Sequence, residues 1–193
     1  MTSEDNPVSR LAEEEREGMG DMNKWVAAAL VSFSAGLDQG TKWWTVNNVV
    51  LHDSFPVFGQ WLWWAHERNT GAAFSMLSNN NGFFIGLSLL ALVGLILCLW
   101  KKVFSGKLNQ TALLLVLSGV IGNGTDRLVH KSVIDFISVD LGFWPFHPWP
   151  TFNVADSAIC VAVLLLFYTS LRDEWQARSQ HKDCLLYTSD AAD

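Results

Sequence analysis

The stretch GFFIGLSLLALVGLILCLW, residues 82–100, carries no charged side chain over 19 consecutive positions. An α-helix rises about 1.5 Å per residue, so a helix of this length can cross the roughly 30 Å of hydrocarbon in a bilayer. The stretch therefore predicts a transmembrane helix and indicates that the chain is a membrane protein.

A second clear candidate lies near the C-terminal end of the chain. Residues 154–171 contain one charged side chain, that of Asp156 close to the start, and the pair Arg172 and Asp173 follows the segment. Charges at the ends of a long apolar run are typical of a membrane helix. We expect Asp156 to lie at the mouth of this helix.

Two further segments are apolar but interrupted at one end. Residues 25–44 contain Asp38 and Lys42, and in the span predicted at about 109–126 the apolar run 111–121 leads into the polar sequence GNGTDR. A buried helix of a soluble protein is the alternative for such runs, but two strong spans nearby favour the membrane. Residues 57–64 alternate only in part, and predict a short strand or an interfacial sheet. The expected fold is an all-α membrane protein with four transmembrane helices, such a strand or sheet and interfacial loops.

Basic residues indicate the orientation of the four predicted helices. Residues 101–110 contain three lysines and no acid, which marks this connection as cytoplasmic, and with four spans both termini then face the cytoplasm. Nine of the 13 basic residues fall in segments that this topology places there. The loops at 45–81 and 128–151 are expected on the outer face.

Composition divides the chain into four parts. Residues 1–24 hold most of the acidic excess and predict a disordered cytoplasmic tail, so the formal net charge of −6 does not describe the rest. Residues 25–171 form the predicted membrane domain, and residues 172–183 a cytoplasmic tail. Residues 184–193 resemble the translation of a sequencing adapter and are left out of the fold prediction. Nothing in this charge pattern indicates a nucleic-acid partner.

Polar clusters near the membrane are costly and point to function. Asp38 and Lys42 lie four residues apart and predict an ion pair on one helix face. The run NTGAAFS, with Asn69 and Gly71, suits close backbone approach or binding of an extended peptide, and equally a turn before a helix. In GNGTDR, which contains Asn123, Arg127 could clamp a carboxylate or a lipid phosphate, although a helix cap explains most of this polar stretch.

Two aspartates, Asp135 in VIDFI and Asp156 in FNVADSAI, are both expected on the outer side in apolar surroundings. Asn153 precedes Asp156 by three residues and could cap the helix or orient the acid. Two neighbouring carboxyls share one proton, so one can accept a proton from water while the other donates to a carbonyl. The pair predicts an aspartic protease. No metal site or cofactor is predicted, because neither His nor Cys residues cluster.

Taken together, five sequence blocks resemble those of the lipoprotein signal peptidases, in the same order. They are DQGTK at 38–42, NTGAAFS at 69–75, GNGTDR at 122–127, VIDFI at 133–137 and FNVADSAI at 152–159. The resemblance covers about residues 25–171. It implies an aspartic endopeptidase of the bacterial inner membrane, with a small extracytoplasmic β-sheet and a site near the outer face.

The resemblance also implies a substrate and the roles of residues. The substrate is a prolipoprotein with a diacylglyceryl-modified cysteine, cut just before that cysteine, and cyclic peptides of the globomycin type are expected inhibitors. Membrane lipids are further partners. Asp135 and Asp156 match the catalytic aspartates, and the supporting positions are Asp38, Lys42, Asn69, Gly71, Asn123, Arg127 and Asn153.

Two other classes of function remain as alternatives. A proton-coupled carrier also places paired carboxylates in a membrane, but it predicts inverted repeats and broken helices, and the sequence shows neither. A membrane scaffold without catalytic activity would require that both aspartates be dispensable.

Overall fold

The computed structural model describes residues 22–71, 80–143, 147 and 149–190. It contains four long helices, α2 (Lys24–Asn48), α3 (Asn81–Trp100), α4 (Lys107–His130) and α5 (Val154–Asp190). The acidic segment at residues 1–21 lies outside the described residues, so its predicted disorder remains a prediction.

Three of these helices are long and apolar enough to cross a membrane: α3, α4 and the Val154–Ser179 part of α5. The fourth helix, α2, has 25 residues, but it buries the polar side chains of Asp38, Lys42 and Thr45. The predicted four-span count is therefore supported by length and composition for three helices, and α2 as a span remains a prediction.

Helix α4 is the centre of the bundle and packs against α2, α3 and α5. Its contact with α5 is close: a Cβ added at Gly119 would lie 2.6 Å from Ile159 Cγ1 and 2.7 Å from Ala155 O. Only glycine allows the two backbones to approach in this way.

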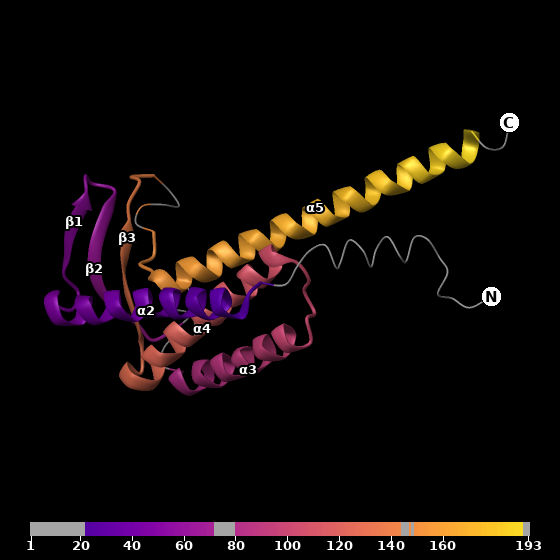
Figure 1. Ribbon diagram of the computed structural model, residues 1–193. Coiled ribbons are helices and arrows are strands. Elements are labelled where there is room, and N and C mark those ends of the chain that lie inside the picture. The colour runs from indigo at the N-terminus through magenta and orange to yellow at the C-terminus, as the bar shows by residue number, and fades with distance from the viewer. Residues whose placement is uncertain (1–21, 72–79, 144–146, 148, 191–193) are drawn as a thin grey trace.

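A three-stranded antiparallel sheet lies at one end of the helices (Figure 1) and is ordered β1 (Ser54–Phe58), β2 (Leu62–Asn69) and β3 (Val133–Val139). The short strand or interfacial sheet expected within residues 57–64 is found as part of a hairpin, because the chain reverses at residues 59–61, where Gly59 has a φ of +54°. The expected small sheet is confirmed, and its strands extend over residues 54–58, 62–69 and 133–139.

The segment at residues 128–151 was expected to be a loop, and this prediction was wrong for its first half. Residues 128–130 complete α4, and residues 133–139 form β3, whose first four residues are all buried. Strand β3 pairs with β2, with Leu62 opposite Val139 and Glu67 opposite Asp135. The β-branched residues around Asp135 favour a strand that is covered on both faces.

Residue Phe152 ties the start of α5 to the free side of β3. The backbone N–H groups of Phe136 and Ile137 donate to Phe152 O over 3.0 and 2.8 Å, and Phe152 N donates back to Ile137 O over 3.0 Å. This short bridge brings the first turn of α5 beside Asp135.

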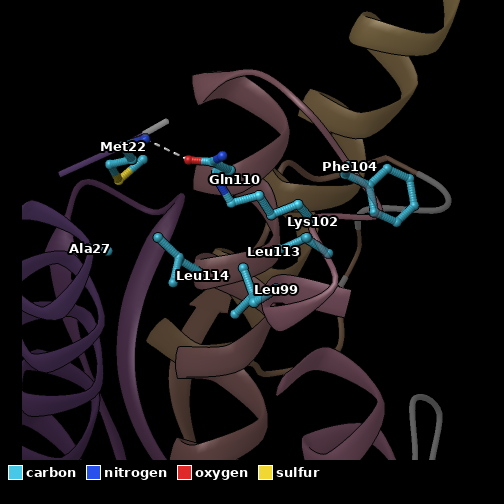
Figure 2. A pocket seen from close by; sticks show the side chains of 8 residues that line it. All are labelled: Met22, Ala27, Leu99, Lys102, Phe104, Gln110, Leu113 and Leu114. Carbon is cyan, nitrogen blue, oxygen red and sulfur yellow. Dashed lines mark hydrogen bonds between the residues drawn. The ribbon is translucent and has the colours of Figure 1, made fainter. Parts of the chain in front are cut away.

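The opposite end of the bundle contains the start of α2, the connection between α3 and α4, and the far end of α5 (Figure 1). A cavity of about 280 Å³ opens there between Ala27, Leu99, Leu113 and Leu114 (Figure 2). None of the residues that line this cavity belongs to the predicted site. The predicted site residues lie toward the end of the bundle that carries the sheet. Helix α5 continues to Asp190, through most of the segment left out of the fold prediction.

Candidate active site

A buried ion cluster connects α2 to α4. Lys42 Nζ lies 2.8 Å from Asp38 Oδ2 and 2.9 Å from Asp126 Oδ2, and all three residues are about 1% exposed. The predicted pair of Asp38 and Lys42 is confirmed, but Asp126 was not predicted as a partner. Gln39 Nε2 donates to Asp126 Oδ1 over 3.0 Å and to Asp38 Oδ2 over 3.2 Å, so the acidic oxygens are well supplied with donors.

The polar sequence GNGTDR lies inside α4, whereas a turn or cap at the end of a helix was expected. Helix α4 continues to His130 and ends where Lys131 adopts a left-handed φ of 59°. The helical spacing directs Asp126 toward Lys42 and brings Asn123 to the same cluster, where it accepts from Lys42 Nζ over 3.0 Å. Gly122 provides space, because a Cβ there would lie 2.5 Å from Asp38 Oδ2.

Asp156 is held at the first turn of α5 by Asn153. Asn153 Oδ1 accepts from Asp156 N over 2.9 Å, and Asp156 Oδ2 accepts from Asn153 N over 3.2 Å. This reciprocal arrangement satisfies two N–H groups that a helix start leaves without intrahelical partners. Asn123 Nδ2 donates to the other oxygen, Asp156 Oδ1, over 2.8 Å. Asp156 remains half-buried, so water can reach its carboxyl group.

Asp135 is 2% exposed and accepts from two amides. Asn153 Nδ2 donates to Oδ1 over 2.7 Å, and Asn69 Nδ2 donates to Oδ2 over 3.2 Å. Asn153 was predicted to cap the helix or to orient Asp156; it contacts Asp156 at the helix start, and its contact with Asp135 was not predicted from the residues.

The two aspartates share a hydrogen-bond network. Asn153 Nδ2 lies 3.2 Å from Asn123 Oδ1, so the amide bound to Asp135 also meets the amide bound to Asp156. Burial and, after it, the negative charge of Asp156 raise the pKa of Asp135 to about 7, against the opposing effects of the two amides and Lys42. With a pKa near 7, Asp135 is partly protonated at neutral pH, and two neighbouring carboxyls that share a proton are able to act as an acid and a base.

Arg127 links this network to the chain that follows β2. Its Nη2 donates to Gly71 O over 3.0 Å, its Nη1 lies 3.5 Å from Asn123 O, and its guanidinium sits 4.8 Å from the ring centroid of Phe84. Asn69 Oδ1 accepts from Gly71 N over 3.0 Å, so Asn69 and Gly71 form a local turn. These hydrogen bonds of Arg127 go to backbone carbonyls, and its contact with a carboxylate or a lipid phosphate stays a prediction.

All nine predicted site residues thus lie in one connected region beside the sheet. Within the described part of the chain, no three His, Cys, Asp or Glu side chains are grouped as a metal site would require. A family model described as signal peptidase II matches residues 30–172 of the sequence.

The chain belongs to the signal peptidase II family. A lipoprotein signal peptidase of Bacillus pumilus is 40% identical over 137 residues, which cover 71% of this chain and 86% of that protein. One of Geobacter metallireducens is 39% identical over 164 residues, which cover 83% of this chain and 98% of that protein.

Solved structures of bacterial membrane enzymes share the fold of this signal peptidase II family member. Two bacterial membrane enzyme structures, obtained by the in meso method at 2.3 and 1.9 Å resolution, match with TM-scores of 0.72 and 0.71 at 29% sequence identity. They cover 78% and 80% of this chain, and the matches include 90% and 98% of theirs. As a signal peptidase II family member with three long apolar helices, the chain is a peptidase and a multi-pass membrane protein.

Two residues of this signal peptidase II family member were missed at the sequence level: Asp126 and Gln39. Both lie within quoted motifs, GNGTDR and DQGTK. The spacing of Asp126 three residues after Asn123 could have signalled a shared helix face, but only if the motif had been read as helix. Gln39 has no comparable signal, because two of its three partners, Gly122 O and Asp126, come from a different helix.

Proposed function

We propose that this protein is an aspartic endopeptidase that removes signal peptides from diacylglyceryl-modified prolipoproteins, with Asp135 and Asp156 as its catalytic pair. The observation that carries the proposal is the joint support of both carboxyls by Asn153. Its side chain donates to Asp135, and its backbone N–H donates to Asp156. Two carboxyls fixed by one residue, with Asp135 partly protonated at neutral pH, have what water-mediated amide hydrolysis requires.

The proposed reaction uses one water and returns the pair to its starting state. The ionised carboxylate takes a proton from water, whose oxygen attacks the scissile carbonyl carbon, while the protonated carboxyl donates to the carbonyl oxygen. The tetrahedral intermediate then collapses: the carboxyl that took the proton from water gives it to the amine nitrogen of the lipidated cysteine as the C–N bond breaks. A hydroxyl group of the intermediate returns a proton to the other carboxylate, and the new carboxyl group stays on the signal peptide. The pair again holds one proton.

We propose four membrane spans, with α2 as the first, and both termini in the cytoplasm. The end of the bundle opposite the sheet carries Lys24, Lys101, Lys102 and Lys107, as the excess of basic residues on cytoplasmic loops predicts. The aspartates and the sheet then face the outer side of the inner membrane. At this level both water and a lipid-anchored cysteine can reach the site, and cyclic peptides of the globomycin type are expected to compete there.

The test is a gel-shift assay with a purified diacylglyceryl-modified prolipoprotein. Wild-type protein should cleave just before the lipidated cysteine, whereas Asp135→Asn and Asp156→Asn should each lose at least about 10²-fold in rate, as the loss of a general acid or base does. Asp140→Asn is the matched control, since Asp140 lies five residues after Asp135 and interacts with His147. Full activity in either dyad variant would remove that residue from the mechanism.

A further inference from the structure

The two carboxylates of the ion cluster each hold the backbone immediately before a proposed catalytic aspartate. Asp126 Oδ2 accepts from the N–H of Ile134 over 3.0 Å, and Ile134 precedes Asp135. On the other side of the cluster, Asp38 Oδ1 accepts from the N–H of Ala155 over 2.8 Å, one residue before Asp156. Each of the two catalytic segments, β3 at Ile134 and α5 at Ala155, is therefore anchored by one structural carboxylate.

Lys42 joins these two anchors. An ammonium group has three N–H donors, and three acceptors surround Lys42 Nζ: Asp38 Oδ2 at 2.8 Å, Asp126 Oδ2 at 2.9 Å and Asn123 Oδ1 at 3.0 Å. Asn123 in turn donates to Asp156. Since its Oδ1 is occupied by Lys42, the amide of Asn123 is oriented with its Nδ2 toward the dyad.

We propose that Lys42, Asp38 and Asp126 form a positioning clamp that sets the distance between the two catalytic carboxyls, an inference that rests on the proposed function. The clamp ties the β3 segment at Ile134 and the α5 segment at Ala155 to a single cation on α2. None of the three side chains is a catalytic residue, because their hydrogen-bonded connections to the dyad run through backbone N–H groups and Asn123.

A clamp at this place has a physical purpose. The two aspartates lie on different elements, which apart from the cluster are tied by the backbone bridge at Phe152 and by Asn153. How strongly two carboxyls share a proton depends on their separation, and misplacement of reacting groups by about 1 Å can cost roughly 10²-fold in rate. The buried Lys42 ammonium group holds both anchoring carboxylates, and through them it fixes the β3 and α5 segments relative to each other.

A plain structural ion pair is the competing explanation, and the pH profile separates the two. Removal of one negative charge alone would shift both limbs of a kcat/KM profile in the same direction. A wider spacing of the carboxyls weakens their coupling and brings the two apparent pKa values of the pair closer together. Only the second change reports on geometry.

The primary variant is Asp126→Asn, which preserves side-chain shape and leaves Lys42 paired with Asp38, so the fold should persist. We expect kcat to fall at least about tenfold with KM changed less than about threefold, and the bell-shaped profile to narrow. Ser118→Ala is the matched control: Ser118 bonds Ser34 between the same two helices, over 2.9 Å, without contact with the clamp. It should leave the profile unchanged.

A second variant removes all clamp charges together: Lys42→Met with Asp38→Asn and Asp126→Asn. Amide exchange adds a readout independent of activity, and the N–H groups of Ile134 and Ala155 should exchange faster than in wild type while the Phe136 and Ile137 N–H groups remain protected. The inference would be overturned if, in either clamp variant, the two limbs of the pH profile were as far apart as in wild type and the amides of Ile134 and Ala155 exchanged at the wild-type rate. Absence of cleavage by the wild type would instead count against the proposed function.

Discussion

The side-chain amide of Asn153 donates to Asp135 Oδ1 over 2.7 Å, and both residues are almost completely buried. The same residue caps α5 and accepts from Asp156 N. A single asparagine thus connects the helix start to both members of the proposed pair.

Asn153→Ala should therefore affect stability and catalysis together. Loss of the cap typically costs about 0.5–2 kcal/mol, and buried groups left without partners cost roughly 1–3 kcal/mol more. Cleavage should fall at least about tenfold in the correctly folded fraction, because Asp135 loses its shorter amide contact. Thermal unfolding in detergent and the gel-shift assay measure the two effects.

The control for this variant is Asn48→Ala, which removes an exposed amide bonded to Trp44 O over 2.7 Å. Exposed contacts of this kind change stability by less than about 0.5 kcal/mol, and activity should be unaffected. Equal cleavage rates in Asn153→Ala and wild type would contradict the supporting role of Asn153.

The raised pKa of Asp135, about 7, predicts that stability depends on pH. An aspartate in the unfolded chain titrates near 4, so between these values the folded state binds more protons, and the free energy of unfolding must fall as pH rises. The loss is complete above about pH 7 and amounts to a few kcal/mol at most, at about 1.36 kcal/mol per unit. Asp135→Asn removes the titration and should raise the Tm at pH 8 but not at pH 4.

Asp140 supplies a control of opposite sign. A hydrogen bond with His147 lowers the pKa of Asp140. The ionised Asp140 therefore stabilises the folded protein at any pH above the usual aspartate range. Asp140→Asn should thus lower or leave unchanged the Tm at pH 8, relative to wild type. Parallel Tm curves for Asp135→Asn and wild type from pH 4 to 8 would show that Asp135 does not retain its proton.

Local spacing predicted only those parts of the site that lie within one helix. Asp38 and Lys42 were found because four residues separate neighbours on a helix face, and the apolar runs revealed α3 and α5. Asp126 was missed as a partner because its contacts with Lys42 and with Ile134 N are both tertiary.

Strand β3 and the helical state of GNGTDR were missed for a different reason. An apolar pentapeptide around one acid has no periodicity that separates strand from loop, and its pairing partner β2 comes from a distant part of the chain. Gly122 and Asn123 favour turns when considered alone. In the structure, contacts of Gly122 with α2 and α5 and of Asn123 with Lys42 and Asp156 outweigh that local preference.

Gly122→Ala should disturb the site although it adds only a methyl group. The added Cβ would lie 2.5 Å from Asp38 Oδ2 and 3.2 Å from Ala155 Cβ, so the carboxylate or the start of α5 must move. Overpacking of this kind costs typically 1–3 kcal/mol. We expect a lower Tm and a cleavage rate reduced about tenfold or more, since Asp38 and Ala155 both lead to the dyad.

Gly124→Ala is the matched control, two residues along the same helix. Its nearest neighbour would be Ser88 Cβ at 3.7 Å, an ordinary contact, and alanine favours a helix by up to about 1 kcal/mol over glycine. The Tm should stay the same or rise, with activity retained. Equal effects of the two substitutions would show that the space beside Asp38 is not critical.

Arg127→Lys tests whether the guanidinium acts through its shape or only through its charge. The two nitrogens Nη1 and Nη2 contact Asn123 O and Gly71 O while the flat group lies over Phe84, and lysine cannot reproduce this planar fork. We expect cleavage to fall about tenfold or more, because the turn that carries Asn69 loses its link to α4. Arg172→Lys, at an exposed pair with Asp173, should leave the rate unchanged. Wild-type kinetics in Arg127→Lys would mean that a positive charge alone suffices at this position. They would also show that the support of Asp135 by Asn69 does not depend on the hydrogen bond between Arg127 and Gly71 O.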